Sequence, residues 1–194
     1  MEQFLQNTLQ NSQDAFQKWK KIPFEERQKY FTQLSEILNN RKQEFATIIT
    51  QEMNKPISQS VSEIEKCAAL CDYYATAKNI LKTEQVETEF QISEIHHEPL
   101  GVILGVMPWN FPFWQAIRFA VPTILAGNVI VLKHASICEK SGETMQEIFE
   151  EAGFPKGIFT FLKVSHAQVE EMIAHPIIRG VSLTGSEAAG RKIA

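Results

Sequence analysis

The second half of the chain alternates short apolar runs with helical patterns, and this alternation restricts the possible folds more than any other feature. The apolar runs occupy residues 102–106, 129–132, 158–164 and 178–183. The helical patterns occupy residues 113–126, 137–152 and 166–174, and a further one begins at residue 186. Strands that alternate with helices form parallel sheets joined by right-handed crossovers. We therefore expect an α/β fold with a Rossmann-like parallel sheet in this half.

The N-terminal part of the chain predicts helices without strands. Apolar residues recur every three or four positions, as at Leu5 and Leu9, which is the period of one helix face. Pro23 and Pro56 mark places where one helix ends and the next begins. We expect residues 1–82 to form helices whose apolar faces point into the core.

The pattern changes again at residues 83–100. Apolar and polar residues alternate over residues 86–92, which predicts a half-exposed strand. A second extended run is expected at residues 95–97.

The composition excludes several classes of protein. The chain has 194 residues and a net charge of -4, so it lacks the basic surface that nucleic-acid binding needs. Its longest apolar stretch, residues 121–132, is interrupted and too short to span a bilayer. It has no secretory signal pattern, and its 3 cysteines do not make a disulfide framework. We expect a cytoplasmic protein that binds neither nucleic acid nor membrane.

Two pairs of potential metal ligands also occur. Cys67 and Cys71 lie four residues apart on a predicted helix, but no third and fourth ligand stand nearby. His96 and His97 are adjacent in an extended run, so their side chains point to opposite faces. We expect no metal site.

The first apolar run leads into a corner with the sequence GVMPWNFP, residues 105–112. Pro108 and Pro112 restrict the backbone, which predicts a stiff turn that presents Trp109 and Asn110 in fixed directions. The Asn110 amide is a donor suited to a developing oxyanion. Alternatively it caps the following helix, and its spacing alone favours that interpretation.

The second run ends at Lys133, which can reach a ribose hydroxyl or a phosphate. Alternatively Lys133 is a solvated charge, and Ser136 forms a capping box with Glu139. Both interpretations can hold, because ligands of such sheets bind beyond the carboxyl ends of the strands, where the helix caps also lie. His134 is interpreted as a surface loop residue.

The last run ends in Gly185 and Ser186. Glycine allows close backbone approach, and free N–H groups at a helix start bind phosphate. The pattern is neither GxGxxG nor a P-loop, and Thr184 with Glu187 also fits a capping box. These observations make a phosphate site one of two open interpretations.

Taken together, the motifs resemble the aldehyde dehydrogenase superfamily over the whole chain. That family carries PWNFP, a KPxE or KPxS tetrad, an EAGxPxG turn and a GSTxxG turn, and this sequence has PWNFP, KHAS, EAGFPKG and GSExxG. The resemblance implies NADP or NAD as cofactor, a small aldehyde as substrate and Asn110 as the oxyanion donor. It implies a cofactor site made of Met107, Pro108, Trp109, Lys133, Ser136, Gly185 and Ser186.

The resemblance also implies a division of the chain. Residues 1–82 would be the helical part of the cofactor-binding domain, and residues 83–100 would belong or lead to an oligomerisation element. Residues 101–194 would be an incomplete NAD(P)-binding part, truncated before the catalytic domain. The family's nucleophilic cysteine and glutamate base would lie in that domain. Cys138 is close to a helix start, which can lower a thiol pKa, but it lies near the expected adenosine end. We therefore expect a homo-oligomeric enzyme whose present fragment is inactive.

Two departures from the family pattern affect the cofactor. Glu187 replaces the threonine of GSTxxG and would be unfavourable beside a pyrophosphate unless it points away. Ser136 replaces the glutamate that would bind both ribose hydroxyls and repel a 2′-phosphate. We therefore predict that NADP is used at least as well as NAD.

Arg118 indicates the substrate. It lies about two helical turns after Asn110 and is flanked by apolar residues. In succinate-semialdehyde dehydrogenases an arginine at the matching position pairs with the substrate carboxylate, and FPFWQAIRFAVP and LTGSEAAG resemble a bacterial branch of those enzymes. Two alternatives remain open: a dehydrogenase of uncharged aldehydes, in which Arg118 is structural, and a non-catalytic nucleotide-binding module.

Overall fold

The computed structural model describes residues 2–78 and 80–193. Its helices are α1 (Gln3–Trp19), α2 (Phe24–Asn40), α3 (Lys42–Met53), α4 (Ile57–Thr76), α5 (Pro112–Leu125), α6 (Glu139–Glu151), α7 (His166–Ile173) and α8 (Glu187–Ile193), with a short 3₁₀ helix, η1 (Ser136–Cys138). Its strands are β1 (Glu84–Gln85), β2 (Glu94–Ile95), β3 (Val102–Met107), β4 (Val129–His134), β5 (Phe159–Phe161) and β6 (Ile178–Leu183).

The predicted parallel sheet is confirmed. Its strands lie in the order β5-β4-β3-β6, and each neighbouring pair is parallel. Leu104 of β3 faces Val131 of β4 on one side and Val181 of β6 on the other. This is the strand order of a Rossmann fold, in which the chain crosses back over its first strand. The position where ligands bind in such folds is therefore at the carboxyl ends of β3 and β6.

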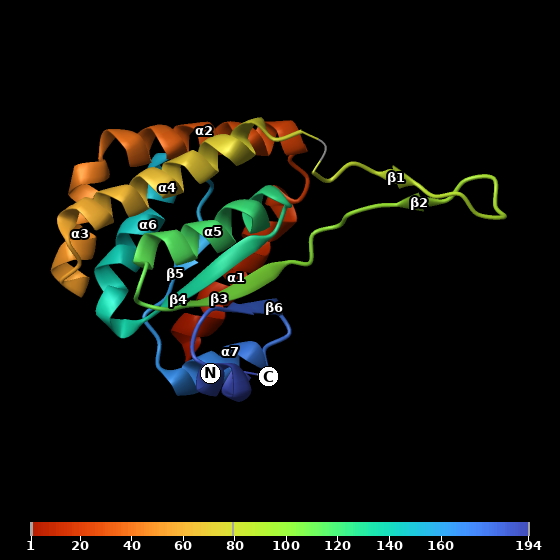
Figure 1. Cartoon of the computed structure of the whole chain (residues 1–194). Helices are drawn as coiled ribbons and strands as arrows, with labels where there is room; N and C mark the ends of the chain where they lie inside the picture. The colour runs from red at the N-terminus through yellow and green to blue at the C-terminus, as the bar shows by residue number, and fades with distance from the viewer. Residues whose placement is uncertain (1, 79, 194) are drawn as a thin grey trace.

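Helices cover both faces of the sheet (Figure 1). Helix α5 contacts β3 and β4, and α4 and α2 lie outside α5 as a further layer. Helix α1 contacts β3 and β4 from the opposite face, where α7 packs on β6. This arrangement buries β4 completely, which explains why its sequence is a continuous apolar run and not an alternating one.

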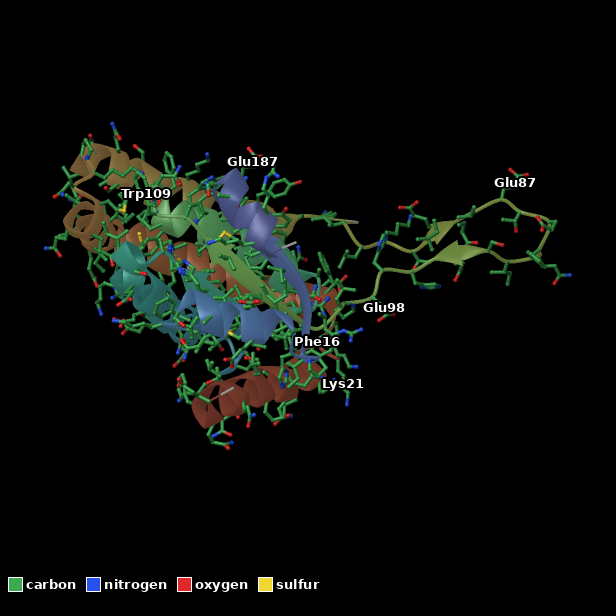
Figure 2. The ribbon with its side chains drawn as sticks, turned by 90° about the horizontal axis from the view of Figure 1, so that it is seen from below. Phe16, Lys21, Glu87, Glu98, Trp109 and Glu187 are labelled. Carbon is green, nitrogen blue, oxygen red and sulfur yellow. The ribbon has the colours of Figure 1, made fainter. Side chains whose placement is uncertain are left out.

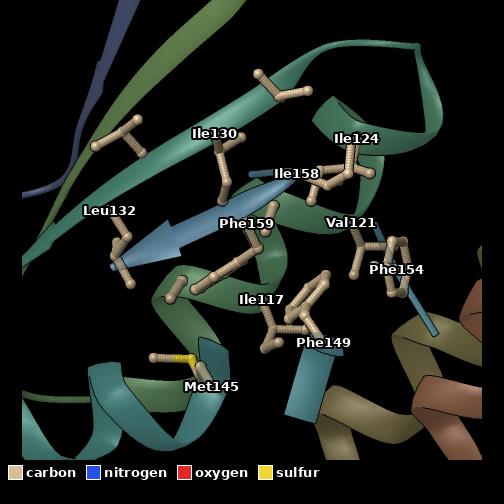
Figure 3. Packing of buried hydrophobic residues seen from close by; sticks show 14 of the residues in the cluster. Ile117, Val121, Ile124, Ile130, Leu132, Met145, Phe149, Phe154, Ile158 and Phe159 are labelled. Carbon is tan, nitrogen blue, oxygen red and sulfur yellow. The ribbon is translucent and has the colours of Figure 1, made fainter. Parts of the chain in front are cut away.

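The main core lies between the sheet and helices α5 and α6 (Figure 3). Ile117 and Val121 of α5 are no more than 1% exposed, and the Phe149 ring of α6 stacks on Phe159 at 4.3 Å between centroids. Ile130 of β4 lies in the same cluster. Each such side chain contributes about 1.5–3 kcal/mol relative to exposure, so this packing fixes α5 against the strands.

The C-terminal end of α5 is held by the N-terminal helices. Trp19 Nε1 donates to the Ile124 carbonyl at 2.8 Å, and Arg27 Nε donates to the Leu125 carbonyl at 2.8 Å. The last carbonyls of a helix lack intrahelical partners and cost free energy when they are buried unpaired. These two side chains therefore join residues 1–82 to the sheet domain. The helices predicted there are confirmed as α1 to α4.

Residues 83–100 form an arm that extends away from the body, with Glu87 near its tip (Figure 2). The strand predicted at residues 86–92 is wrong: β1 and β2 pair antiparallel at 84–85 and 94–95, and the alternating residues lie in the loop between them. Phe90 is 71% exposed and Ile92 is 75% exposed. The alternation was not a sign of burial on this chain, because no described element covers the arm.

Other boundaries differ by a few residues from the prediction. β4 continues to His134, β5 is confined to Phe159–Phe161, and the helix expected from residue 137 begins as η1 and becomes α6 at Glu139. Helix α5 runs through Pro122. None of the described helices is both long enough and apolar enough to cross a membrane.

Candidate active site

The corner after β3 presents its aromatic and amide side chains to solvent. Met107 is buried at the end of β3, whereas Trp109, Asn110 and Phe111 are exposed. The helix-cap interpretation of Asn110 is wrong. The N-cap residue of α5 is Phe111, and the side chain of this cap residue makes no hydrogen bond to the helix start. The Asn110 amide is therefore left available to a ligand.

A buried carboxylate from α4 takes the place of that cap. Glu63 Oε1 accepts the backbone N–H of Phe113 at 2.9 Å and that of Trp114 at 3.0 Å. Its other oxygen pairs with Lys55, whose Nζ also lies 3.8 Å from the centroid of the Phe111 ring. Nothing in the sequence around Glu63 distinguishes it from a solvated helix residue, so sequence reasoning missed it.

Lys133 lies at the end of β4 and is only 8% exposed. Burial lowers the pKa of its ammonium, and within the described residues it has no hydrogen-bond or ion-pair partner. An unpaired buried ammonium is unfavourable unless a ligand completes it. The alternative that Lys133 is a solvated charge is wrong.

The interpretation of His134 as a surface loop residue is wrong, because its exposed fraction is only 3%. Its Nε2–H donates to the Pro112 carbonyl at 2.9 Å, and its Nδ1 accepts the Ala135 N–H at 2.9 Å. Burial lowers the pKa of His134 to about 4, against the opposing effect of the bond to Pro112. The neutral ring therefore links the end of β4 to the corner after β3.

The capping box predicted from Ser136 and Glu139 is absent. Ser136 is exposed at the start of η1, and neither η1 nor α6 receives a side-chain bond from its cap residue. Instead Glu52 of α3 accepts the N–H of Lys140 at 2.6 Å and also bonds Ser141. The Ser136 hydroxyl is thus not committed to a helix cap.

The helix predicted to begin at Ser186, after the end of β6, is confirmed as α8. Ser186 Oγ accepts the Ala189 N–H at 3.2 Å, so Ser186 and not Thr184 supplies the capping oxygen. Glu187 pairs with Arg191 at 2.6 Å on the exposed side of α8. This ion pair turns the carboxylate along the helix and balances its charge.

Lys133 and Ser186 share one groove, with a volume of about 680 Å³. Its walls come from Val106 at the end of β3, from α7 and from α8. Gly185 is exposed beside Ser186.

The other predicted residues do not line this groove. Pro108, Trp109 and Asn110 lie at the corner, and Ser136 begins η1. Arg118 is exposed on α5, where its Nη2 donates to Gln115 at 2.8 Å. A second hollow, of about 800 Å³ between α1 and β5, contains none of the predicted residues.

The cysteines are buried free thiols. Burial raises the pKa of Cys138 to about 12, the opposite of the lowering that its place near a helix start had indicated, and it also raises the pKa values of Cys67 and Cys71. The described residues include no group of three or more His, Cys, Asp or Glu able to hold a metal.

The strand order and the groove at the strand ends define a Rossmann-type α/β domain. The chain belongs to the aldehyde dehydrogenase family, whose model matches residues 2–194.

Relatives and solved structures agree with this assignment. A probable NADP⁺-dependent succinate-semialdehyde dehydrogenase of Synechocystis is 44% identical over 187 residues, which are 96% of this chain and 41% of that protein. An Escherichia coli NAD(P)⁺ succinate semialdehyde dehydrogenase is 40% identical over 97% of this chain and 41% of its own. The structure of the Streptococcus pyogenes succinic semialdehyde dehydrogenase, solved with NADP⁺, matches this chain with a TM-score of 0.96 at 37% identity. The match covers 100% of this chain and 43% of the Streptococcus chain. The chain thus spans about two fifths of these relatives' length.

Proposed function

We propose that this chain forms the cofactor-binding part of an NADP⁺- or NAD⁺-dependent aldehyde dehydrogenase that oxidises succinate semialdehyde to succinate. The observation that carries the proposal is the placement of Asn110, Lys133 and Ser186 at or just after the carboxyl ends of adjacent parallel strands, at the edge where Rossmann folds bind dinucleotides. The names of the relatives support the choice of substrate and cofactor.

The groove has the chemistry that a dinucleotide needs. Lys133 offers a buried ammonium without a partner in the described residues, and Ser186 begins a helix whose N-terminal N–H groups attract phosphate. Ser136 and Gly185 are exposed nearby in sequence. We assign to the cofactor Lys133, Ser136, Gly185 and Ser186, together with Met107, Pro108 and Trp109 at the corner. The bound cofactor would accept a hydride from the substrate.

Asn110 is assigned the oxyanion. Its amide is exposed, does not titrate and stands on a corner held by packing on both sides, so it costs little reorganisation when negative charge develops on the substrate oxygen. The cysteine nucleophile is assigned to a part of the enzyme outside this chain, because the three thiols present are buried and the nucleophile must be an accessible thiolate.

Arg118 is assigned the substrate carboxylate. It is exposed and bonded only to the neutral Gln115 within the described residues, so its guanidinium retains donors for a bidentate carboxylate. The arm of residues 83–100 is assigned to oligomerisation, since none of the described residues covers its exposed Phe90 and Ile92.

The test is reduction of NADP⁺ by succinate semialdehyde, followed through the absorbance of the reduced nicotinamide, in the complete enzyme that contains this chain. Asn110→Ala should lower kcat by about 10²–10³-fold, the cost of one lost oxyanion donor, without weakening NADP⁺ binding. Asn40→Ala, an exposed asparagine at the end of α2, is the matched control. An enzyme that turns over no aldehyde, or an Asn110→Ala variant with full activity, would overturn the proposal.

A further inference from the structure

The buried ion pair formed by Lys55 and Glu63 touches the corner at more than one place. Glu63 has a side-chain exposure of 0% and Lys55 one of 10%. Burying two charges is costly, and a buried ion pair is weak evidence for stabilisation of the fold. Its position beside the reactive corner therefore calls for an account in terms of function.

The pair holds the residues on the C-terminal side of Asn110. Glu63 accepts the N–H groups of Phe113 and Trp114, at 2.9 and 3.0 Å, and the Lys55 ammonium lies over the Phe111 ring. Asn110 is the residue directly before Phe111. Within the described residues no hydrogen bond holds its side-chain amide, so the direction of that amide depends on how its neighbours are fixed.

Both members of the pair come from outside the sheet. Lys55 lies in the turn between α3 and α4, directly after Asn54, which has a left-handed φ of 53°, and Glu63 lies two turns into α4. The pair thus transmits the position of the N-terminal helices to the strand-to-helix corner.

We propose that Lys55 and Glu63 are positioning residues that set the direction of the Asn110 amide toward the reacting oxygen. This inference rests on the proposed function. A misplacement of about 1 Å costs roughly 10²-fold in rate, so loss of the pair acts on kcat. Neither residue lines the groove or is among the residues assigned to the cofactor, so we expect removal of the pair to leave the Kd for NADP⁺ unchanged.

The test uses the complete enzyme and a matched control. Lys55→Met/Glu63→Gln removes both charges while retaining an oxygen for the two backbone N–H groups. Lys42→Met/Glu65→Gln removes an exposed ion pair of 2.6 Å between α3 and α4, away from the corner. We expect the first variant to lose roughly 10- to 100-fold in kcat with an unchanged Kd for NADP⁺, and the control to lose nothing.

Combination with Asn110→Ala separates positioning from general destabilisation. If the pair acts through Asn110, removing the pair from the Asn110→Ala enzyme should lower kcat by less than about twofold. The reason is that the effects of residues that act as a unit are not additive. An equal loss in both backgrounds would overturn the proposal.

A second readout does not depend on catalysis. Hydrogen exchange of the Phe113 and Trp114 amides should be faster in the Lys55→Met/Glu63→Gln variant, because the neutral amide oxygen is a weaker acceptor than the paired carboxylate, and unchanged in the control. Unchanged exchange would refute the positioning role even in an inactive enzyme, whereas a wild-type enzyme that oxidises no aldehyde would refute the proposed function alone.

Discussion

His134 gives the stability of this protein a specific dependence on pH. Burial lowers the pKa of its imidazole from 6.5 to about 4 in the folded state. The protonated ring could not accept the Ala135 N–H through Nδ1, and its charge would be buried. Between pH 6.5 and about pH 4, His134 is therefore protonated in the unfolded state and neutral in the folded state.

The sign and the size follow from linkage. Because the folded pKa is the lower one, the contribution of His134 is fully present above pH 6.5 and is lost as the pH falls toward about 4. Integrated from pH 7 to pH 4.5, the loss is about 2 kcal/mol of unfolding free energy. A non-titrating His134→Gln variant should lack this component, whatever its own stability at pH 7.

The assay is urea unfolding of both proteins at several pH values in that interval, with the variant serving as the reference for every other titrating group. The unfolding free energy of the wild type minus that of the variant should fall by about 2 kcal/mol as the pH falls from 7 to 4.5. Parallel pH profiles for the two proteins would refute the buried, neutral state of His134.

Three further substitutions test two site residues and one packing contact. Ser136→Glu should move the ratio of kcat/KM values from NADP⁺ toward NAD⁺, because a carboxylate repels the 2′-phosphate; an unmoved ratio would remove the assignment. Arg118→Ala should raise KM for succinate semialdehyde far more than for an uncharged aldehyde of similar length, and equal effects would make Arg118 structural. Gly142→Ala should lower Tm and cost about 1–3 kcal/mol of unfolding free energy, because a new methyl group would collide with the Phe161 ring; an unchanged Tm would show that the ring can move aside.

The sheet could be predicted from the sequence because its two central strands, β3 and β4, are buried on both faces. Runs such as residues 102–106 and 129–132 have few competing interpretations when they alternate with helical patterns. The positions of Asn110, Lys133 and Ser186 at or just after the ends of their strands followed from the same alternation. The arm could not be placed in this way, because its alternating residues pack against nothing in the described chain.

The contacts that hold the site could not be predicted, because they are formed between residues distant in sequence. Glu63 lies 50 residues before Phe113, and its burial depends on how α4 lies across α5. The buried His134 finds its partner in a carbonyl that the corner after β3 supplies at its Nε2. Local patterns show which residues are polar, whereas the tertiary structure decides which of them are buried.

The two ends of α5 also bear on the order in which the protein folds. The acceptor for its N-terminal amides lies 50 residues away, and the donors to its last carbonyls lie 105 and 98 residues away. Contacts between residues so far apart form slowly, since long loops must close first. The helix that follows the corner after β3 can therefore reach its final form only after the N-terminal helices have docked, and a folding intermediate with a finished sheet would still have an unfinished candidate site.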